Sequence, residues 1–115
     1  MKQFSFGKEE KLFRPQEFKR AMRKGEGRGT DHFTVFILPN QINKRRLGIT
    51  ASRKVGAATR RNRIKRLLRE FFRLHKSCLP PSSDILFIAK PGADRVNYSE
   101  LCEELKILLK PDTPF

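Results

Sequence analysis

AATRRNRIKRLLREFFRLHK, residues 57–76, is the stretch of sequence that decides the fold. Its apolar residues recur at intervals of three and four, which predicts one amphipathic helix over the whole stretch. The apolar side of this helix consists of Ile64, Leu67, Leu68 and Phe71. The opposite side carries polar and cationic residues, namely Asn62, Lys65, Arg66, Arg69, Arg73 and Lys76. We therefore expect the helix to bury one side against a core and to present a cationic side outward.

The positive charge of the chain is concentrated in and around this helix. The sequence has 26 Lys and Arg against 12 Asp and Glu, for a net charge of +14. A charge this large indicates an anionic partner, either a nucleic acid or an anionic membrane surface. A solvated helix normally pairs opposite charges one turn apart, but Glu70 is the only acid in residues 57–76. RNA or DNA contact is favoured, because a membrane would compete with the core for the apolar side.

On the N-terminal side of this helix, the sequence predicts a shorter helix and two strands. Residues 15–24 have a proline at the first helical position and are followed by a glycine, as is typical of a short helix. Residues 32–38 and 46–53 flank a polar turn and are expected to be strands that pair as an antiparallel hairpin. Residues 25–29 have room for a further short edge strand, although glycine at alternate positions disfavours it.

On the C-terminal side, one strand and one helix are predicted. Residues 84–89, DILFIA, form a continuous apolar run that is typical of a strand buried on both faces and therefore central in its sheet. Asn97 and Glu100 have the spacing of a capping box, which predicts that a helix begins there. Pro111 is expected to end this helix.

The length of 115 residues indicates one domain. We expect this domain to span residues 13–110, between a flexible basic tail at residues 1–12 and a C-terminal tail at residues 111–115. The start of the chain does not resemble a signal peptide, and no segment is apolar enough to span a bilayer. Cys78 and Cys102 are expected to be reduced thiols, which together with these features indicates the cytoplasm.

The sequence contains no recognisable catalytic constellation. His32 and His75 are isolated, and the acids do not gather as a metal-dependent nuclease requires. We therefore expect neither catalytic residues nor metal ligands in the protein. Two readings of the phenylalanines remain open, since they could form a groove that stacks single-stranded bases or simply belong to the core. The residues in question are Phe13, Phe18, Phe33 and Phe36, with Arg14, Arg28 and Lys90 nearby, and strand alternation places Phe33 and Phe36 on opposite faces.

The segment KVGAATRRNRIKRLLRE, residues 54–70, resembles the signature of the bacterial ribonuclease P protein component. The segments GITASRK at residues 48–54 and IAKP at residues 88–91 agree in order and spacing, so that the resemblance covers residues 10–109. It implies an α/β (α+β) two-layer sandwich in the order αβββαβα, with a mixed sheet and a left-handed βαβ crossover, as in the ribosomal protein S5 domain 2-like fold. Topology rules alone would predict a right-handed crossover.

The resemblance also implies a function and its residues. Members of the family partner a catalytic RNA that removes the 5′ leader of precursor tRNA. The reaction uses Mg²⁺ that is held mainly by the RNA. One protein is expected to bind each RNA. The chain would thus be a subunit of an endoribonuclease whose catalysis comes from the RNA. The implied contacts to the catalytic RNA are Lys54, Arg60, Arg61, Asn62, Arg63, Lys65, Arg66 and Arg69. The implied contacts to the leader, in a groove between the first helix and the sheet, are Phe18, Met22, Phe33, Phe36, Thr50, Ser52 and Lys90.

Three residues depart from the family pattern: Ala57 where Asn is frequent, Thr59 where Val is frequent, and Met22 where an aromatic residue is common. Met can still cover the face of a base. Two other functions share some of these features. A ribosomal or other structural RNA-binding protein would have the same charge and basic helix, and a metal-dependent nuclease would act without an RNA subunit.

Overall fold

Strand β4 (Ser83–Ala89) lies at the centre of a four-stranded sheet in the computed structural model, which describes residues 14–108 apart from the side chain of Lys76. Helix α1 (Pro15–Lys24) is followed by β1 (Glu26–Gly29), β2 (Phe33–Pro39) and β3 (Arg46–Thr50). Helix α2 (Ala58–His75), β4 and helix α3 (Tyr98–Leu105) complete the chain. The order αβββαβα and the α+β class agree with the expectation from the sequence.

The sheet is mixed, with the strand order β1-β2-β4-β3. Strand β4 pairs antiparallel with β2 and parallel with β3, and β1 is an edge strand on β2. The predicted hairpin between residues 32–38 and 46–53 is therefore wrong, because β4 lies between the two strands. The central position of β4 was correctly predicted, since a run that is apolar on both sides is most stable with neighbours on both edges. The left-handed sense of the β3–α2–β4 crossover stays a prediction.

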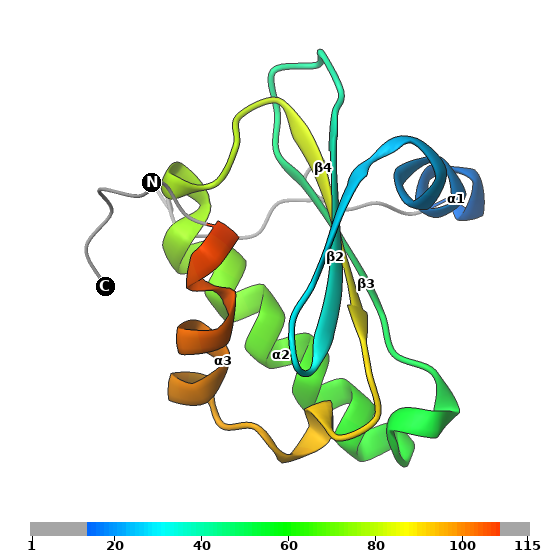
Figure 1. Ribbon diagram of the computed structural model, residues 1–115, viewed down its shortest axis with the longest axis vertical. Coiled ribbons are helices and arrows are strands. Elements are labelled where there is room, and N and C mark those ends of the chain that lie inside the picture. The colour runs from blue at the N-terminus through cyan, green and yellow to red at the C-terminus, as the bar shows by residue number, and fades with distance from the viewer. Residues whose placement is uncertain (1–13, 109–115) are drawn as a thin grey trace.

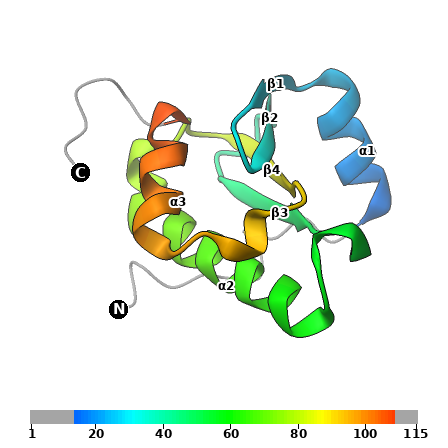
Figure 2. The same ribbon diagram turned by 60° about the horizontal axis from the view of Figure 1, so that its bottom comes forward.

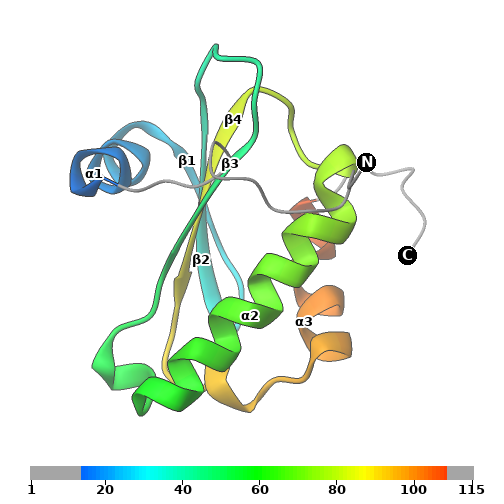
Figure 3. The same ribbon diagram turned by 180° about the vertical axis from the view of Figure 1, so that it is seen from behind.

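The sheet is covered on both faces. Helices α2 and α3 pack on one face and α1 on the other (Figures 1, 2 and 3). The main core lies between the sheet and α2 and α3, and the apolar side of α2 enters it through Ile64, Leu68 and Phe71, all fully buried. Complete burial of each such side chain contributes about 1.5–3 kcal/mol of transfer free energy. This burial fixes which side of α2 is left to face outward.

The helix ends follow the local chemistry of the sequence. In α1, Pro15 occupies the first turn and the backbone N–H of Arg14 donates to Glu17 at 3.1 Å. In α3, the Asn97 side chain accepts from the Glu100 N–H at 2.8 Å, and Glu100 accepts from the Asn97 N–H at 2.9 Å. This reciprocal pair is the capping box that the sequence predicted. The expected end of α3 at Pro111 lies outside the described residues.

Two further expectations concern the cysteines and the membrane. Cys78 and Cys102 are free thiols and partly buried, as predicted. Burial raises the pKa of the Cys102 thiol, which disfavours its thiolate. Within residues 14–108, no helix combines the length and the apolar character that crossing a bilayer requires.

Candidate nucleic-acid interface

The residues predicted to contact the catalytic RNA lie at the N-terminal half of α2 and just before it. We call this set the motif surface: Lys54, Arg60, Arg61, Asn62, Arg63, Lys65, Arg66 and Arg69. Asn62, Arg66 and Arg69 follow one another at helical spacing and are exposed. Their side chains form no ion pair or hydrogen bond with any residue in the described range. They are therefore available to an external anion.

Two arginines of the motif surface are held by the loop after β4. Arg60 Nη1 lies 3.1 Å from Asp94 Oδ2, and Arg63 Nη1 donates to the Asp94 carbonyl oxygen at 3.1 Å. The Asp94 side chain is only 7% exposed, so it is fixed within the fold. A β-carbon at Gly56 would lie 3.3 Å from Arg60 Cδ, which shows how closely the chain passes this side chain. Sequence reasoning missed Asp94, because it lies 34 residues from Arg60.

The cationic side of α2 is shorter than the sequence predicted. Arg73 is paired with Glu70, with Nε–Oε1 at 3.0 Å and Nη2–Oε2 at 2.6 Å. The hydrogen bond from Arg73 lowers the pKa of Glu70 and keeps the carboxylate charged. Arg73 is thus neutralised by its own helix, and nothing is described for the Lys76 side chain. Within the described part of α2, the row of unpaired cations ends at Arg69.

The residues predicted to contact the leader do not all lie on one face of the sheet. Phe33 and Val35 of β2 point into the core beneath α2 and α3, so that strand alternation turns Phe36 toward α1. Phe33 is 0% exposed and cannot offer its ring to a base, so its assignment to the leader site is corrected. Continuous pairing of β2 with β4 leaves no bulge to change this alternation.

We call the remaining set the α1–sheet surface: Phe18, Met22, Phe36, Thr50, Ser52 and Lys90. Met22 is 42% exposed, whereas Phe18 and Phe36 are partly buried. The Phe36 ring lies over Gly27, its partner on β1, since a β-carbon at Gly27 would lie 2.9 Å from Phe36 Cε1. Phe13 lies outside the described residues. The structure thus supplies apolar side chains beside polar and cationic ones on this face.

Two basic residues that were expected near this surface, Lys90 and Arg28, already donate hydrogen bonds within the protein. Lys90 Nζ donates to the Thr30 carbonyl oxygen at 2.6 Å, which places the ammonium group beside the turn between β1 and β2. Arg28 contacts Glu26 and donates to the Ile107 carbonyl oxygen at 3.4 Å, away from α1. Lys90 keeps two further N–H donors for an anion, whereas Arg28 belongs to a different region.

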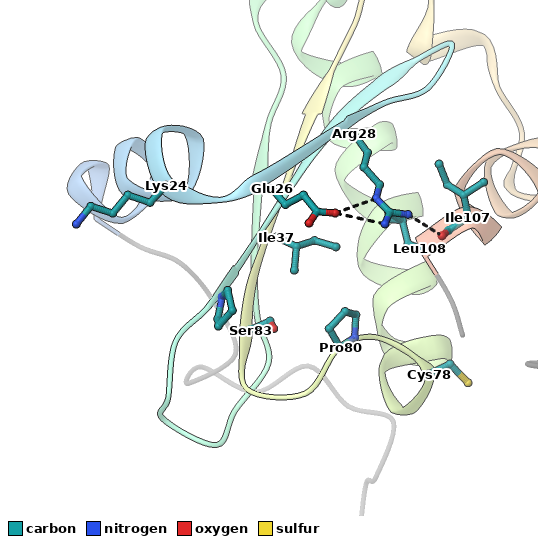
Figure 4. Close-up of a pocket in the computed structure, with 10 residues that line it drawn as sticks. Lys24, Glu26, Arg28, Ile37, Cys78, Pro80, Ser83, Ile107 and Leu108 are labelled. Carbon is teal, nitrogen blue, oxygen red and sulfur yellow. Dashed lines mark hydrogen bonds and ion pairs between the residues drawn. The ribbon is translucent and has the colours of Figure 1, made fainter. Parts of the chain in front are cut away.

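That region is a pocket of about 630 Å³, drawn in Figure 4. It is lined by Lys24, Glu26, Arg28, Ile37, Pro39, Cys78, Pro80, Ser83, Ile107 and Leu108. None of these residues belongs to the motif surface or to the α1–sheet surface. The pocket is therefore separate from the groove that the sequence predicted.

Residues 14–108 contain no group of three or more His, Cys, Asp or Glu side chains placed to hold an ion. The carboxylate oxygens that Mg²⁺ prefers are not gathered in this part of the chain. The described residues therefore do not fit a protein-held Mg²⁺.

The two surfaces adjoin along the chain. Thr50 ends β3, Ser52 and Lys54 lie two and four residues further along the chain, and α2 begins at Ala58. A nucleic acid on the α1–sheet surface would thus run directly to one bound by the motif surface. Fold and site together define a small cationic α+β protein of the RNA-binding class.

Comparison with known proteins identifies the family. A family model described as ribonuclease P matches residues 6–111. The ribonuclease P protein component of Syntrophus aciditrophicus is 39% identical over 95% of this chain and 92% of its own length. That of Desulfosudis oleivorans is 46% identical over 88% and 84%. The chain belongs to the ribonuclease P protein family.

Solved structures agree with this assignment. The RNase P protein of Thermotoga maritima superposes with a TM-score of 0.79 at 34% identity, covering 91% of this chain and 99% of that protein. The RNase P protein of Staphylococcus aureus gives 0.79 at 33% identity, covering 86% and 91%. The α+β fold with a mixed sheet that the resemblance implied is thereby confirmed.

Proposed function

We propose that this chain is the protein subunit of ribonuclease P, which binds the catalytic RNA through the motif surface and the 5′ leader of precursor tRNA through the α1–sheet surface. The domain that does so spans residues 13–110, works in the bacterial cytoplasm and binds one RNA subunit. The observation that carries the proposal is the junction at residues 50–54, where the two surfaces meet on one continuous stretch of chain. Membership of the ribonuclease P family supports it.

The motif surface suits the phosphate backbone of a structured RNA. Guanidinium groups of Arg66 and Arg69 can each offer paired N–H donors to phosphate oxygens, and the Asn62 amide can both donate and accept. Asp94 holds Arg60 and Arg63 in defined positions, which reduces the side-chain entropy lost when RNA binds. These contacts position the RNA and do not read its sequence.

The α1–sheet surface suits a single strand. Phe18 and Phe36 can stack on unpaired bases, while Thr50, Ser52 and Lys90 can donate to sugar or phosphate oxygens. Hydrolysis itself is assigned to the RNA subunit and its Mg²⁺ ions. The protein supplies cations that offset phosphate repulsion between leader and RNA, which lowers the magnesium concentration needed for cleavage.

The test is reconstitution. Cognate catalytic RNA is incubated with precursor tRNA at low magnesium, with and without the protein, and 5′ leader release is measured. We expect stimulation by the protein together with tighter binding of precursor than of mature tRNA. Binding to the RNA without any stimulation would favour a structural RNA-binding protein. Cleavage by RNA-free protein would favour a nuclease acting alone.

A further inference from the structure

One acid contacts the motif surface, which otherwise carries only polar and cationic residues. Asp94 belongs to the short helical turn Ala93–Arg95, which the chain forms after β4. Its carboxylate Oδ2 lies 3.1 Å from Arg60 Nη1, and its backbone carbonyl oxygen accepts from Arg63 Nη1 at 3.1 Å. Two arginines that are neighbours on the surface of α2 thus converge on a single residue.

Asp94 is held in place by the residues on either side of it. Ala93 and Val96 are both buried and anchor the turn in the core. The backbone N–H of Ala93 donates to the Lys90 carbonyl oxygen at 3.0 Å, and that of Val96 donates to the Ala93 carbonyl oxygen at 3.4 Å. The Asp94 side chain is itself almost completely buried. Its carboxylate is therefore a fixed negative charge that is not free to turn away into solvent.

Arg60 meets this charge from the solvent side. Its side chain is 66% exposed, so an external anion can reach the guanidinium while Asp94 holds one corner of it. A guanidinium presents several N–H donors in one plane, and the contact with Asp94 uses Nη1. The remaining donors are thereby held in a defined direction. Asn62, Arg66 and Arg69, by contrast, have no partner within residues 14–108 and can follow any anion.

A fixed carboxylate beside one arginine changes how the motif surface responds to different anions. A polyanion with phosphates at arbitrary positions is repelled by Asp94 and must compete with it for Arg60, which weakens attraction that does not depend on sequence. An RNA whose fold places a phosphate along the remaining Arg60 donors binds without breaking the pair. Such an RNA also costs less side-chain entropy to bind, because Arg60 is already ordered. The pair therefore disfavours loose binding more than fitted binding.

We propose that Asp94 is a specificity-determining residue of the motif surface, which acts through Arg60 to favour the structured catalytic RNA over other polyanions. The inference rests on the proposed function and deepens it, because it adds to the RNA-subunit site an acid from outside the arginine-rich helix. A purely structural role for Asp94 makes a different prediction. It would couple Asp94 to the stability of the turn and leave the discrimination between polyanions unchanged.

The experiment measures how variants bind two polyanions. The variants are Asp94→Asn, Arg60→Gln and the double variant Arg60→Gln/Asp94→Asn, each compared with the unchanged protein. The polyanions are the cognate catalytic RNA and random-sequence duplex DNA, whose paired bases cannot stack on the α1–sheet surface. Affinities are measured from about 50 to 200 mM salt. Thermal melts check that each variant folds, as expected because Asn has nearly the shape of Asp and Arg60 is mostly exposed.

The Asp94→Asn variant frees Arg60 for any phosphate. Its affinity for duplex DNA should rise on the order of threefold. The slope of log affinity against log salt should become steeper by roughly 0.9, for one further phosphate contact. Its affinity for the catalytic RNA should fall on the order of threefold, because Arg60 is then ordered only when the RNA binds. With Arg60→Gln already present, Asp94→Asn should leave the salt slope unchanged.

Glu103→Gln is the control for net charge. It changes the net charge by the same amount as Asp94→Asn and also frees a cation from an ion pair, that of Lys106. Glu103 belongs to the last turn of α3, whose end lies away from the start of α2 (Figure 1). This variant should therefore leave the preference for the catalytic RNA over duplex DNA near that of the unchanged protein.

Three outcomes would overturn the inference. An equal loss of preference in Glu103→Gln would assign the effect to net charge. An equal steepening by Asp94→Asn with and without Arg60 would show that Asp94 does not act through Arg60. A lower melting temperature of Asp94→Asn with unchanged discrimination would leave Asp94 a structural role alone.

Failure of the proposed function looks different. The unchanged protein would then bind the catalytic RNA no more tightly than duplex DNA. The salt slope on duplex DNA would still report whether Asp94 restrains Arg60, because that measurement needs no cognate RNA.

Discussion

Arg46 and Asp84 form a two-pronged ion pair across the parallel strands β3 and β4, with Nε–Oδ1 and Nη2–Oδ2 both at 2.8 Å. Arg46 Nη1 also contacts Glu17 of α1 at 2.8 Å, and Asn40 donates to Asp84 at 2.8 Å. The hydrogen bond to Asp84 raises the pKa of Arg46. This cluster thus joins an edge strand, the central strand and α1, and it sets where α1 lies on the sheet.

Removal of Asp84 should therefore destabilise the protein strongly. The Asp84 side chain is 6% exposed, and Asp84→Ala removes the two-pronged partner of Arg46, so that this mostly buried guanidinium keeps only its contact with Glu17. We expect a loss on the order of 3 kcal/mol in the free energy of unfolding, measured by urea titration. The matched control is Glu70→Ala, which breaks a similar but exposed pair with Arg73 and should cost less than about 1 kcal/mol. Equal losses would contradict this assignment.

Arg66→Ala should weaken RNA-subunit binding more than leader binding. Arg66 is exposed on the motif surface and can contact phosphate, so its loss should reduce the salt slope by about 1. If the unchanged protein contacts about six phosphates, its affinity should fall roughly a thousandfold between 50 and 200 mM salt. Filter binding across that range measures both quantities, and a flat salt response would contradict the electrostatic account.

Phe18→Ala should have the opposite selectivity. Phe18 lies on α1, on the face of the sheet opposite the motif surface, and a stacked base is worth about 1–3 kcal/mol. Affinity for precursor tRNA should fall, while affinity for the RNA subunit remains near that of the unchanged protein. Phe18 is partly buried, so thermal melts must accompany the binding data. A fall in both affinities with a normal melting temperature would argue against a leader contact.

Gly27→Ala should disturb the leader surface through Phe36. The added methyl group would lie 2.9 Å from Phe36 Cε1, so the ring must move. Affinity for precursor tRNA should fall, with little change in RNA-subunit affinity. Gly29→Ala is the matched control on the same strand, because its nearest neighbour, Lys90 Nζ, lies at an ordinary 3.7 Å. A similar loss in the two variants would indicate a general effect on β1.

Stability should depend on pH through Glu104, which fastens α3 to the turn between β1 and β2. Burial opposes its ionisation, but hydrogen bonds from Thr30 and His32 outweigh burial and lower its pKa. A carboxylate whose pKa is lowered by folding stabilises the fold at pH values above its unfolded-state pKa of about 4.3. This contribution is lost as the pH falls through its folded-state pKa. Glu104→Gln should therefore be less stable than the unchanged protein at pH 6.

The stability difference between the Glu104→Gln variant and the unchanged protein should shrink at pH 3. Urea unfolding at the two pH values measures it. Glu103→Gln is a suitable control, because Glu103 is 69% exposed and its pair with Lys106 should contribute little at either pH. A difference for Glu104→Gln that stays constant from pH 6 to pH 3 would contradict the role given to its charge.

Local patterns in the sequence predicted the elements well and their neighbours less well. The spacing of Ile64, Leu68 and Phe71 predicted the buried side of α2, and Asn97 predicted the start of α3, because both depend on residues within a few positions. The pairing of β2 with β4 depends on contacts between segments that are distant in the sequence. No local turn pattern in the sequence indicates this pairing. The same reason explains why the contact between Arg60 and Asp94 was missed.

The residues of the candidate site also divide into those that local sequence patterns predicted and those that only contacts between distant segments reveal. Alternation along β2 already separated Phe33 from Phe36, and the structure places Phe33 in the core. The exposed cations of α1 were visible in the sequence at i, i+4 spacing. Only the position of Ala21 against the sheet, and of Glu17 on Arg46, shows how α1 is turned on the sheet.

The placement of β4 between β2 and β3 has a consequence for how the chain folds. Arg46 and its partner Asp84 are 38 residues apart, and α2 is the segment that connects their strands. Because such non-local pairing is slow and requires the intervening segment to be closed as a loop, we expect the sheet and α2 to form in one cooperative step. Neither RNA-binding surface can then persist once the other has unfolded. A variant that loses one binding activity and retains the other is, for that reason alone, a folded protein.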